Sequence, residues 1–289
     1  MAADAAGAED AARQRGMRRA AALTLAMLLL LAACGRTPQT EAPPMPPRFA
    51  QVPGQTPLQQ GQRLATVLGC NGCHGRNLQG QPWSEDAAFA ISFSSNLTRA
   101  LPAYSDRLLE RAIRAGVRAD GSPLWDMPSE IFTELDPADL ALVIAYLRTF
   151  QPAGEVHPLM VLGPNGRRAL ADGSYKSTPQ WVMETHGQTP VRFDAAHDWA
   201  RYMTRATCGE CHTVALTGRR TAQEPQGPPD LNVVGAYARA DFHRLLRTGV
   251  ATGGRQVGLM SQVARNRFSH LTDAEVDAIY DYLAARARR

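Results

Sequence analysis

Apolar residues recur with helical spacing near the end of each half of the chain. Positions i, i+3, i+4 and i+7 lie on one face of an α-helix, so apolar side chains at these positions predict an amphipathic helix. The two stripes consist of Leu140, Val143, Ile144 and Leu147 in the first half, and of Val276, Ile279, Tyr280 and Leu283 in the second half. We expect each of these last helices to pack on the first helix of its own half.

Both predicted helices have clear start signals. Asp136 precedes Pro137, and an acidic N-cap followed by proline suits the first turn of a helix. Thr272 is followed three residues later by Glu275, which is the pattern of a capping box. The sequence therefore predicts helices that begin directly after Asp136 and Thr272.

One pentapeptide pattern, Cys-x-x-Cys-His, occurs once in each half and is called the haem motif below. The two copies contain Cys70, Cys73 and His74, and Cys208, Cys211 and His212. Cysteines three residues apart share one face of a helical turn, where each can form a thioether with a haem vinyl group, and the histidine can become the proximal iron ligand. The sequence predicts two covalently bound haem c groups.

Two other uses of a Cys-x-x-Cys pair are half of a zinc ribbon and a thioredoxin-like redox pair. A zinc ribbon would bring four cysteines around one metal ion. Here each pair is followed at once by a histidine, and Cys70 and Cys208 are 138 residues apart. Both features favour haem attachment.

The two motifs belong to a longer internal repeat. Residues 111–117 match residues 244–250 at an offset of 133, which also relates Met127 to Met260, and the offset becomes 136 at the last helix. Each copy spans roughly 80 to 90 residues, a length at which a hydrophobic core is thin and a buried macrocycle would supply much apolar contact. We expect two versions of one haem module.

A methionine occupies the same position in both copies of the repeat. Met127 and Met260 are each the only methionine between the haem motif of their copy and the end of that copy. A lone methionine commonly fills a core, but thioether sulfur is also an axial haem ligand, and the shared position favours Met127 and Met260 as distal ligands. The first copy has no histidine besides His74, whereas His243 and His270 are rival ligands in the second.

The N-terminus has the pattern of a bacterial secretory signal. Four arginines within residues 13–19 precede an apolar run over 20–33, which is too short to cross a bilayer comfortably. The run ends in Leu-Ala-Ala-Cys at 31–34, which resembles a lipobox, so Cys34 is the predicted lipidation site. The alternative is an ordinary signal peptide that is cut near Ala33 and leaves Cys34 as an unmodified thiol. Met17 is an alternative start.

Composition adds little about partners. The formal net charge is only +4, and no Gly-rich phosphate loop, Ser/His/Asp arrangement or nucleic-acid motif is present in the sequence. We therefore predict no nucleic-acid partner. C-type haem is attached outside the cytoplasm, so the secretory signal and the haem motifs both predict a location on the periplasmic side of a bacterial membrane. Lipid on Cys34 would anchor the chain to that membrane.

Residues 114–124 and 139–148, with Met127 and Pro128, resemble class I c-type cytochrome modules, particularly those of cytochrome subunits that serve periplasmic dehydrogenases. The resemblance covers about residues 61–150 and 199–289. It implies that each iron is held by histidine and methionine: His74 with Met127, and His212 with Met260.

The resemblance also implies a proline carbonyl against each proximal histidine. Pro228 or Pro229 fits this place in the second module, while Pro82 fits it poorly in the first. Hydrogen bonding to a ligating histidine orients its ring.

We expect an all-α fold made of two tandem class I cytochrome c modules joined by a long irregular linker. Along the chain the divisions are a lipoprotein signal peptide (1–33), a proline-rich tether (34–58), the first module (59–150), the linker (151–198) and the second module (199–289). A linker histidine as a haem or metal ligand is the less favoured alternative for His157, His186 and His197.

Two classes of function fit these features. The favoured one is a di-haem electron carrier that works with redox protein partners: a dehydrogenase, an oxidase or a small cytochrome. The alternative is a di-haem peroxidase, which needs one iron with an open or displaceable distal position. A methionine at the matched position of both modules favours the carrier.

Overall fold

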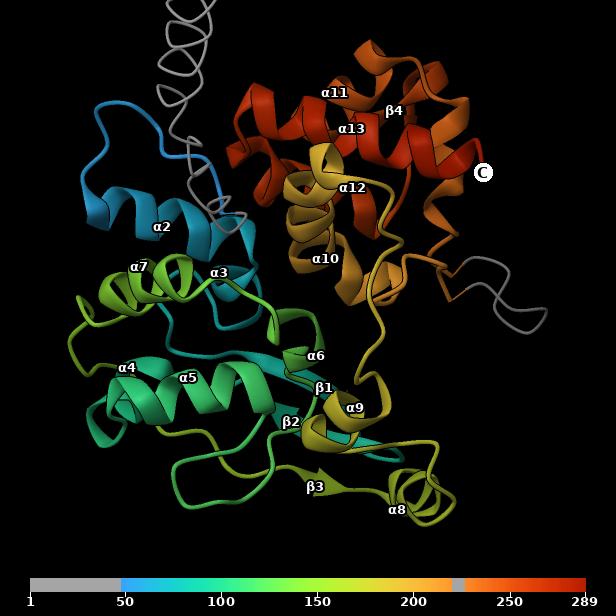
Figure 1. Ribbon diagram of the computed structural model, residues 1–289. Helices are drawn as coiled ribbons and strands as arrows, with labels where there is room; N and C mark the ends of the chain where they lie inside the picture. The colour runs from blue at the N-terminus through green and yellow to red at the C-terminus, as the bar shows by residue number, and fades with distance from the viewer. Residues whose placement is uncertain (1–47, 220–226) are drawn as a thin grey trace, which may run out of the picture. The chain divides into compact units, whose positions relative to one another are not determined.

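The computed structural model describes residues 48–219 and 227–289, which belong to one compact unit that extends from Pro46 to Arg289 (Figure 1). The predicted signal peptide, Cys34 and the tether up to residue 47 lie outside the described residues. Helices dominate, as expected, but two small sheets accompany them. Within the described ranges, no helix combines the length and apolar character needed to cross a bilayer.

In the first module, the first and last helices pack against each other, as predicted. Its elements are α2 (Pro57–Val67), α3 (Cys70–Cys73), β1 (Pro82–Asp86), β2 (Ala90–Phe93), α4 (Leu97–Ala100), the 3-10 helix η1 (Leu101–Ala103), α5 (Asp106–Ala115), α6 (Ser129–Phe132) and α7 (Pro137–Leu147). The haem motif forms α3, directly after α2.

The second module also begins with the helix that leads into the haem motif and ends with a helix that packs on its first, but its strands lie at a different place in the order. Its elements are α10 (Asp198–His212), η3 (Leu231–Ala236), α11 (Arg239–Thr248), β4 (Val250–Ala251), η4 (Thr252–Gly254), β5 (Arg255–Gln256), α12 (Leu259–Asn266), η5 (Phe268–His270) and α13 (Asp273–Ala287). Here the haem motif is the last turn of α10.

The predicted helix starts are confirmed. The Asp136 carboxylate accepts a hydrogen bond from the Ala138 backbone N–H at the start of α7. Thr272 and Glu275 form the capping box at the start of α13. These local signals were sufficient because a cap acts within its own first turn.

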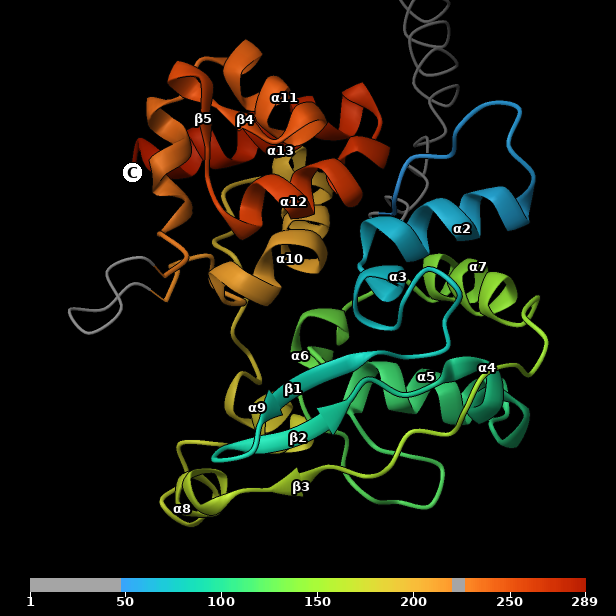
Figure 2. The ribbon, with the colours of Figure 1, turned by 180° about the vertical axis from the view of Figure 1, so that it is seen from behind.

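The linker contains more regular structure than the sequence led us to expect. It comprises β3 (Val161–Leu162), α8 (Pro164–Ala171), α9 (Thr178–Glu184) and the 3-10 helix η2 (Ala195–His197). Strand β3 pairs antiparallel with β2 and completes a sheet of order β1-β2-β3, which Figure 2 shows with α8 beyond the end of β3. A strand of two residues is too short to produce a visible alternation of polar and apolar positions.

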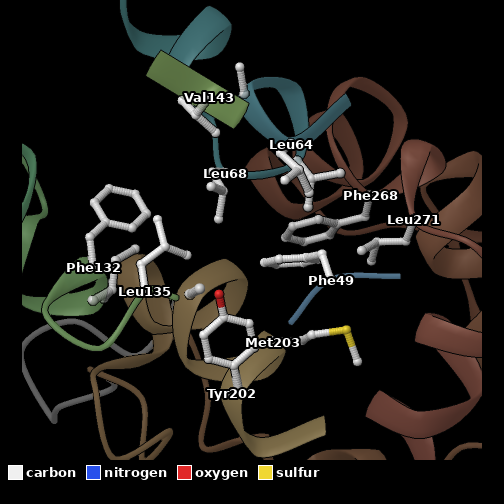
Figure 3. Close-up of a cluster of buried hydrophobic side chains, with 14 of the residues drawn as sticks. Phe49, Leu64, Leu68, Phe132, Leu135, Val143, Tyr202, Met203, Phe268 and Leu271 are labelled. Carbon is white, nitrogen blue, oxygen red and sulfur yellow. The ribbon is translucent and has the colours of Figure 1, made fainter. Parts of the chain in front are cut away.

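The two modules share one hydrophobic core (Figure 3). Phe49, at the end of the predicted tether, is only 2% exposed and lies between Phe268 and Met203, with its ring edge-to-face with Tyr202 at a centroid distance of 5.7 Å. Residues 48–50 are therefore part of the folded core. The prediction of a tether over residues 34–58 overlooked Phe49, which is the only aromatic residue in that range of the sequence.

A buried carboxylate from the last helix of the first module binds this N-terminal segment. Asp139 Oδ2 accepts hydrogen bonds from the Phe49 backbone N–H at 2.9 Å and from the Tyr202 hydroxyl of the second module at 2.8 Å. Burial raises the pKa of Asp139, while the hydrogen bonds from Phe49 and Tyr202 lower it. Asp139 thus connects both modules to the same segment.

Glu275 has the same role from the second module, 136 residues further along the chain. It accepts from the Ala50 backbone N–H at 2.9 Å and forms a buried ion pair with Arg63 of the first module, also at 2.9 Å. Removing one member of a buried, hydrogen-bonded ion pair typically costs about 3 to 5 kcal/mol. These two carboxylates hold the modules together.

Phe49→Ala tests whether residues 48–50 belong to the core. Truncation of a buried phenylalanine leaves a cavity, so the free energy of unfolding should fall by about 3 to 5 kcal/mol in denaturant titrations. Leu58→Ala is the control, because Leu58 is 48% exposed and its truncation should change stability by about 0.5 kcal/mol or less. A loss below about 1 kcal/mol for Phe49→Ala would show that the segment is not part of the core.

Candidate haem-binding sites

The first haem motif forms a separate helical turn. Gly69, the N-cap of α3, has a φ of 89°, which separates this turn from α2. Within it, the His74 backbone N–H donates to the Cys70 carbonyl at 2.9 Å. Cys70 and Cys73 therefore lie one helical turn apart on a shared face, as the attachment of one macrocycle requires.

The second haem motif continues an uninterrupted helix, α10, up to His212. The residue that corresponds to Gly69 at the offset of 138 is Thr207, which stays helical. The two motifs thus have the same local turn but enter it differently.

His74 is held by a single backbone contact. Its Nδ1 lies 2.9 Å from the Ser95 carbonyl oxygen. A carbonyl only accepts, so Nδ1 carries the proton and Nε2 keeps its lone pair. Burial lowers the pKa of His74, against the opposing effect of the Ser95 hydrogen bond. The ring is therefore neutral at neutral pH, which is the form that binds iron.

His212 has the equivalent contact in the second module. Its Nδ1 lies 2.7 Å from the Pro229 carbonyl oxygen, and burial again lowers its pKa. Of the candidate prolines, Pro229 occupies the expected place. Pro82 does not, because it lies in β1, and the Ser95 carbonyl has that role in the first module.

The turn after each motif brings this carbonyl into position. In the first module, the Gly80 N–H donates to the His74 carbonyl at 2.8 Å, and the Leu97 N–H donates to the Leu78 carbonyl at 2.8 Å. Pairing Leu97 with Leu78 places Ser95, two residues earlier, against the imidazole ring.

The second module repeats these contacts closely. The Gly218 N–H donates to the His212 carbonyl at 2.9 Å, and the Leu231 N–H donates to the Leu216 carbonyl at 3.0 Å. Leu216 and its counterpart Leu78 are both fully buried at positive φ, 64° and 57°. Two independent stretches of sequence thus build one backbone geometry.

A sequence signal for Ser95 was present but was not used. Ser95-Asn96-Leu97 aligns with Pro229-Asp230-Leu231, and in both stretches the middle residue caps the helix that follows. The pattern residue-Asx-Leu would have found Ser95, because the contact uses a backbone carbonyl that any residue can supply.

The four motif cysteines are free thiols and are partly buried. Burial raises the pKa of Cys70 to about 12 and of both Cys73 and Cys208 to about 11, and it also raises that of Cys211. Redox-active and thiolate-ligand cysteines have lowered pKa values. The environment therefore does not favour a thioredoxin-like pair.

The zinc alternative also finds no support in the geometry. Among residues 48–219 and 227–289, no group of three or more Cys, His, Asp or Glu side chains is arranged to hold a metal ion. The two Cys-x-x-Cys pairs do not form one four-ligand site in the described chain.

Met127 lies two residues before the start of α6 and packs, partly buried, on the hydrophobic core. The preceding Asp126 has a φ of 60°, and its carboxylate accepts from the Tyr175 hydroxyl at 3.1 Å. Tyr175 also stacks on Trp125, with ring centroids 5.2 Å apart. The linker therefore helps to fix the loop that carries Met127, a role that the sequence analysis missed.

Met260 is the second residue of α12 and is likewise partly buried against the core. His243, the alternative distal ligand, contacts a carboxylate instead: its Nε2 lies 3.0 Å from Asp277 Oδ1. His270 is exposed. These placements agree with methionine ligation without measuring it, so both distal ligands stay predictions.

Two linker histidines also have other partners. His157 Nε2 lies 2.9 Å from the Gln79 carbonyl, and its ring stacks on Phe93. His197 pairs with Asp194 at 2.8 Å. Both contacts favour structural roles for these rings.

The residues present fit a covalently bound haem in each module. Each module offers two thiols on one helical turn and one neutral imidazole whose Nε2 has no hydrogen-bond partner among the described residues. The thiols would form the thioethers and Nε2 would bind iron, with Met127 and Met260 as the predicted ligands on the opposite side.

Comparison with known proteins agrees with this geometry. The family model for cytochrome c matches residues 58–151 and 200–286, one match in each module. The fructose dehydrogenase cytochrome subunit of Gluconobacter japonicus is 27% identical over 302 residues, which cover 93% of this chain and 60% of that subunit. The chain thus spans about three fifths of the length of this relative.

Met127→Ala and Met260→Ala test the distal ligands. Each should abolish one sulfur-to-iron charge-transfer band and lower one midpoint potential, because water or a harder ligand replaces the thioether. His243→Ala is the control and should leave both bands intact. If Met260→Ala keeps both bands, His243 or His270 becomes the better candidate.

Proposed function

The chain belongs to the cytochrome c family, and we propose that it is a di-haem electron carrier on the periplasmic side of a bacterial membrane. The family match supports covalently bound haem c and electron transfer. The number of haems, the partners and the location are parts of the proposal.

The duplicated histidine environment supports two haems. In both modules a backbone carbonyl fixes Nδ1–H at 2.7 to 2.9 Å and leaves Nε2 available. A module that had lost its haem would have no need to keep this tautomer in a buried, neutral ring. Both motifs also keep the two free thiols that would bind a haem.

The chemistry that haem supplies is a one-electron change between ferric and ferrous iron. Ligation by histidine and methionine raises the reduction potential relative to other axial pairs. The protein's part is to orient the imidazole through the Ser95 and Pro229 carbonyls and to keep the motif cysteines partly buried. With Met127 and Met260 as its distal ligands, neither iron would have an open site for substrate.

A dehydrogenase is the partner that the comparison favours. The relative is by name the cytochrome subunit of a dehydrogenase, so we propose that this chain accepts electrons from a dehydrogenase subunit and passes them to a further redox protein. The substrate of that dehydrogenase is left open, because the chain spans only part of the relative's length.

Lipidation at Cys34 is the proposed means of membrane attachment. Mass spectrometry of the protein extracted from membranes should find a mature chain that begins at a lipid-modified Cys34, because the lipobox pattern places the cleavage directly before it. Cys34→Ser should release the chain from the membrane fraction. A freely soluble wild-type chain that starts at another residue would contradict the anchor.

Ligand access separates the carrier from a di-haem peroxidase. With both irons six-coordinate, the reduced protein should bind carbon monoxide slowly or hardly at all and should exchange electrons rapidly with a small redox partner. The rate should fall with salt if charged surfaces steer the encounter. Fast stoichiometric binding of carbon monoxide at one haem, with saturable peroxide reduction that is lost on mutating the second module, would establish the peroxidase instead.

A further inference from the structure

Arg267 of the second module joins the two haem motifs. Its Nη1 donates to Glu210 Oε2 at 2.7 Å, and Glu210 is the residue between Gly209 and Cys211 in the second motif. Its Nε donates to the Val67 carbonyl of α2 at 3.2 Å, three residues before Cys70. One guanidinium therefore contacts the second motif and the chain that leads into the first.

The first module is shaped to admit this side chain. A Cβ at Gly69 would lie only 2.5 Å from Arg267 Cζ, so no larger residue fits there without displacing the guanidinium. Gly69 also has a φ of 89°, which favours glycine independently. Arg267 is only 8% exposed, and its Nη2 is buried without a hydrogen-bond partner among the described residues.

The repeat shows that this arginine is specific to the second module. At the offset of 136, Arg267 corresponds to Ile131 in α6. Ile131 packs on the second haem motif, where a Cβ at Gly209 would lie 2.9 Å from its Cγ2. Ile131 and Arg267 thus each contact the motif region of the other module, but only Arg267 carries a charge.

We propose that Arg267 is a positioning residue shared by both haem sites: it holds the two motifs against one another, and its charge, balanced by Glu210, sets the reduction potential at both. This inference rests on the proposed di-haem function. A positive charge near an iron favours the reduced form, which carries one positive charge fewer, and a buried charge is weakly screened by solvent.

A double-mutant cycle that removes each charge tests the inference on the holoprotein. Both midpoint potentials are measured by spectroelectrochemical titration. Arg267→Gln leaves Glu210 unbalanced and should lower both midpoint potentials. Glu210→Gln leaves Arg267 unbalanced and should raise both. The double variant should return both potentials most of the way to the wild-type values, because it removes one positive and one negative charge whose effects on the potentials are opposite.

Two further variants separate charge from packing. Arg265→Gln removes the same charge from an exposed position of α12 and should shift the potentials much less. Arg267→Lys keeps the positive charge, so it should lower both midpoint potentials by at most half as much as Arg267→Gln does. A purely structural role would lower stability in the Arg267 variants but would not reverse sign with Glu210→Gln.

The inference is wrong if Arg267→Gln moves one potential or neither, if Arg265→Gln moves them equally, or if Glu210→Gln fails to raise both. Should Arg267→Gln not accumulate, the Glu210→Gln result decides alone. The haem content of the wild type is measured first. One haem per chain would contradict the proposed function, whereas two haems with unmoved potentials would contradict only the role of Arg267.

Discussion

The hydrogen bond from the histidine of each haem motif to a backbone carbonyl is the constraint on which both sites depend. An imidazole in water can carry its proton on either nitrogen, and it can bind iron through Nε2 only in the tautomer whose proton is on Nδ1. Ser95 and Pro229 supply the carbonyls at 2.9 and 2.7 Å. The positive-φ turns after each motif, and the leucine pairs that close them, serve to deliver these carbonyls.

A second constraint is the size of each module. A core of roughly 80 to 90 residues is thin, and here the two modules combine theirs around Phe49. Asp139 and Glu275 then bind residues 49 and 50 and reach across to Tyr202 and Arg63. The consequence is that the two haem motifs, joined by Arg267, are fixed relative to one another within one folded unit.

Local signals predicted the last helices and their caps well, because caps and apolar stripes act within a few residues, and both Cys-x-x-Cys-His motifs form the expected helical turn. The internal repeat correctly matched the last helix of the first module, α7, with that of the second, α13. The sequence did not reveal contacts between distant segments: Phe49 in the core, β3 beside β2, or the Tyr175 contact to Asp126. Each depends on tertiary structure. Ser95 was missed because any residue can supply a backbone carbonyl, so only the Asx-Leu pair that follows it, shared with Asp230 and Leu231, marks its position.

Covalent haem content tests the central claim most directly. Acid–acetone extraction removes non-covalent haem and leaves thioether-bound haem on the polypeptide, so the mass of the extracted chain counts the attached groups. Two haems per chain, reduced to one when Cys208 and Cys211 are both replaced by alanine, is the result that the paired sites predict. A wild-type chain that retains one haem or none would contradict the account.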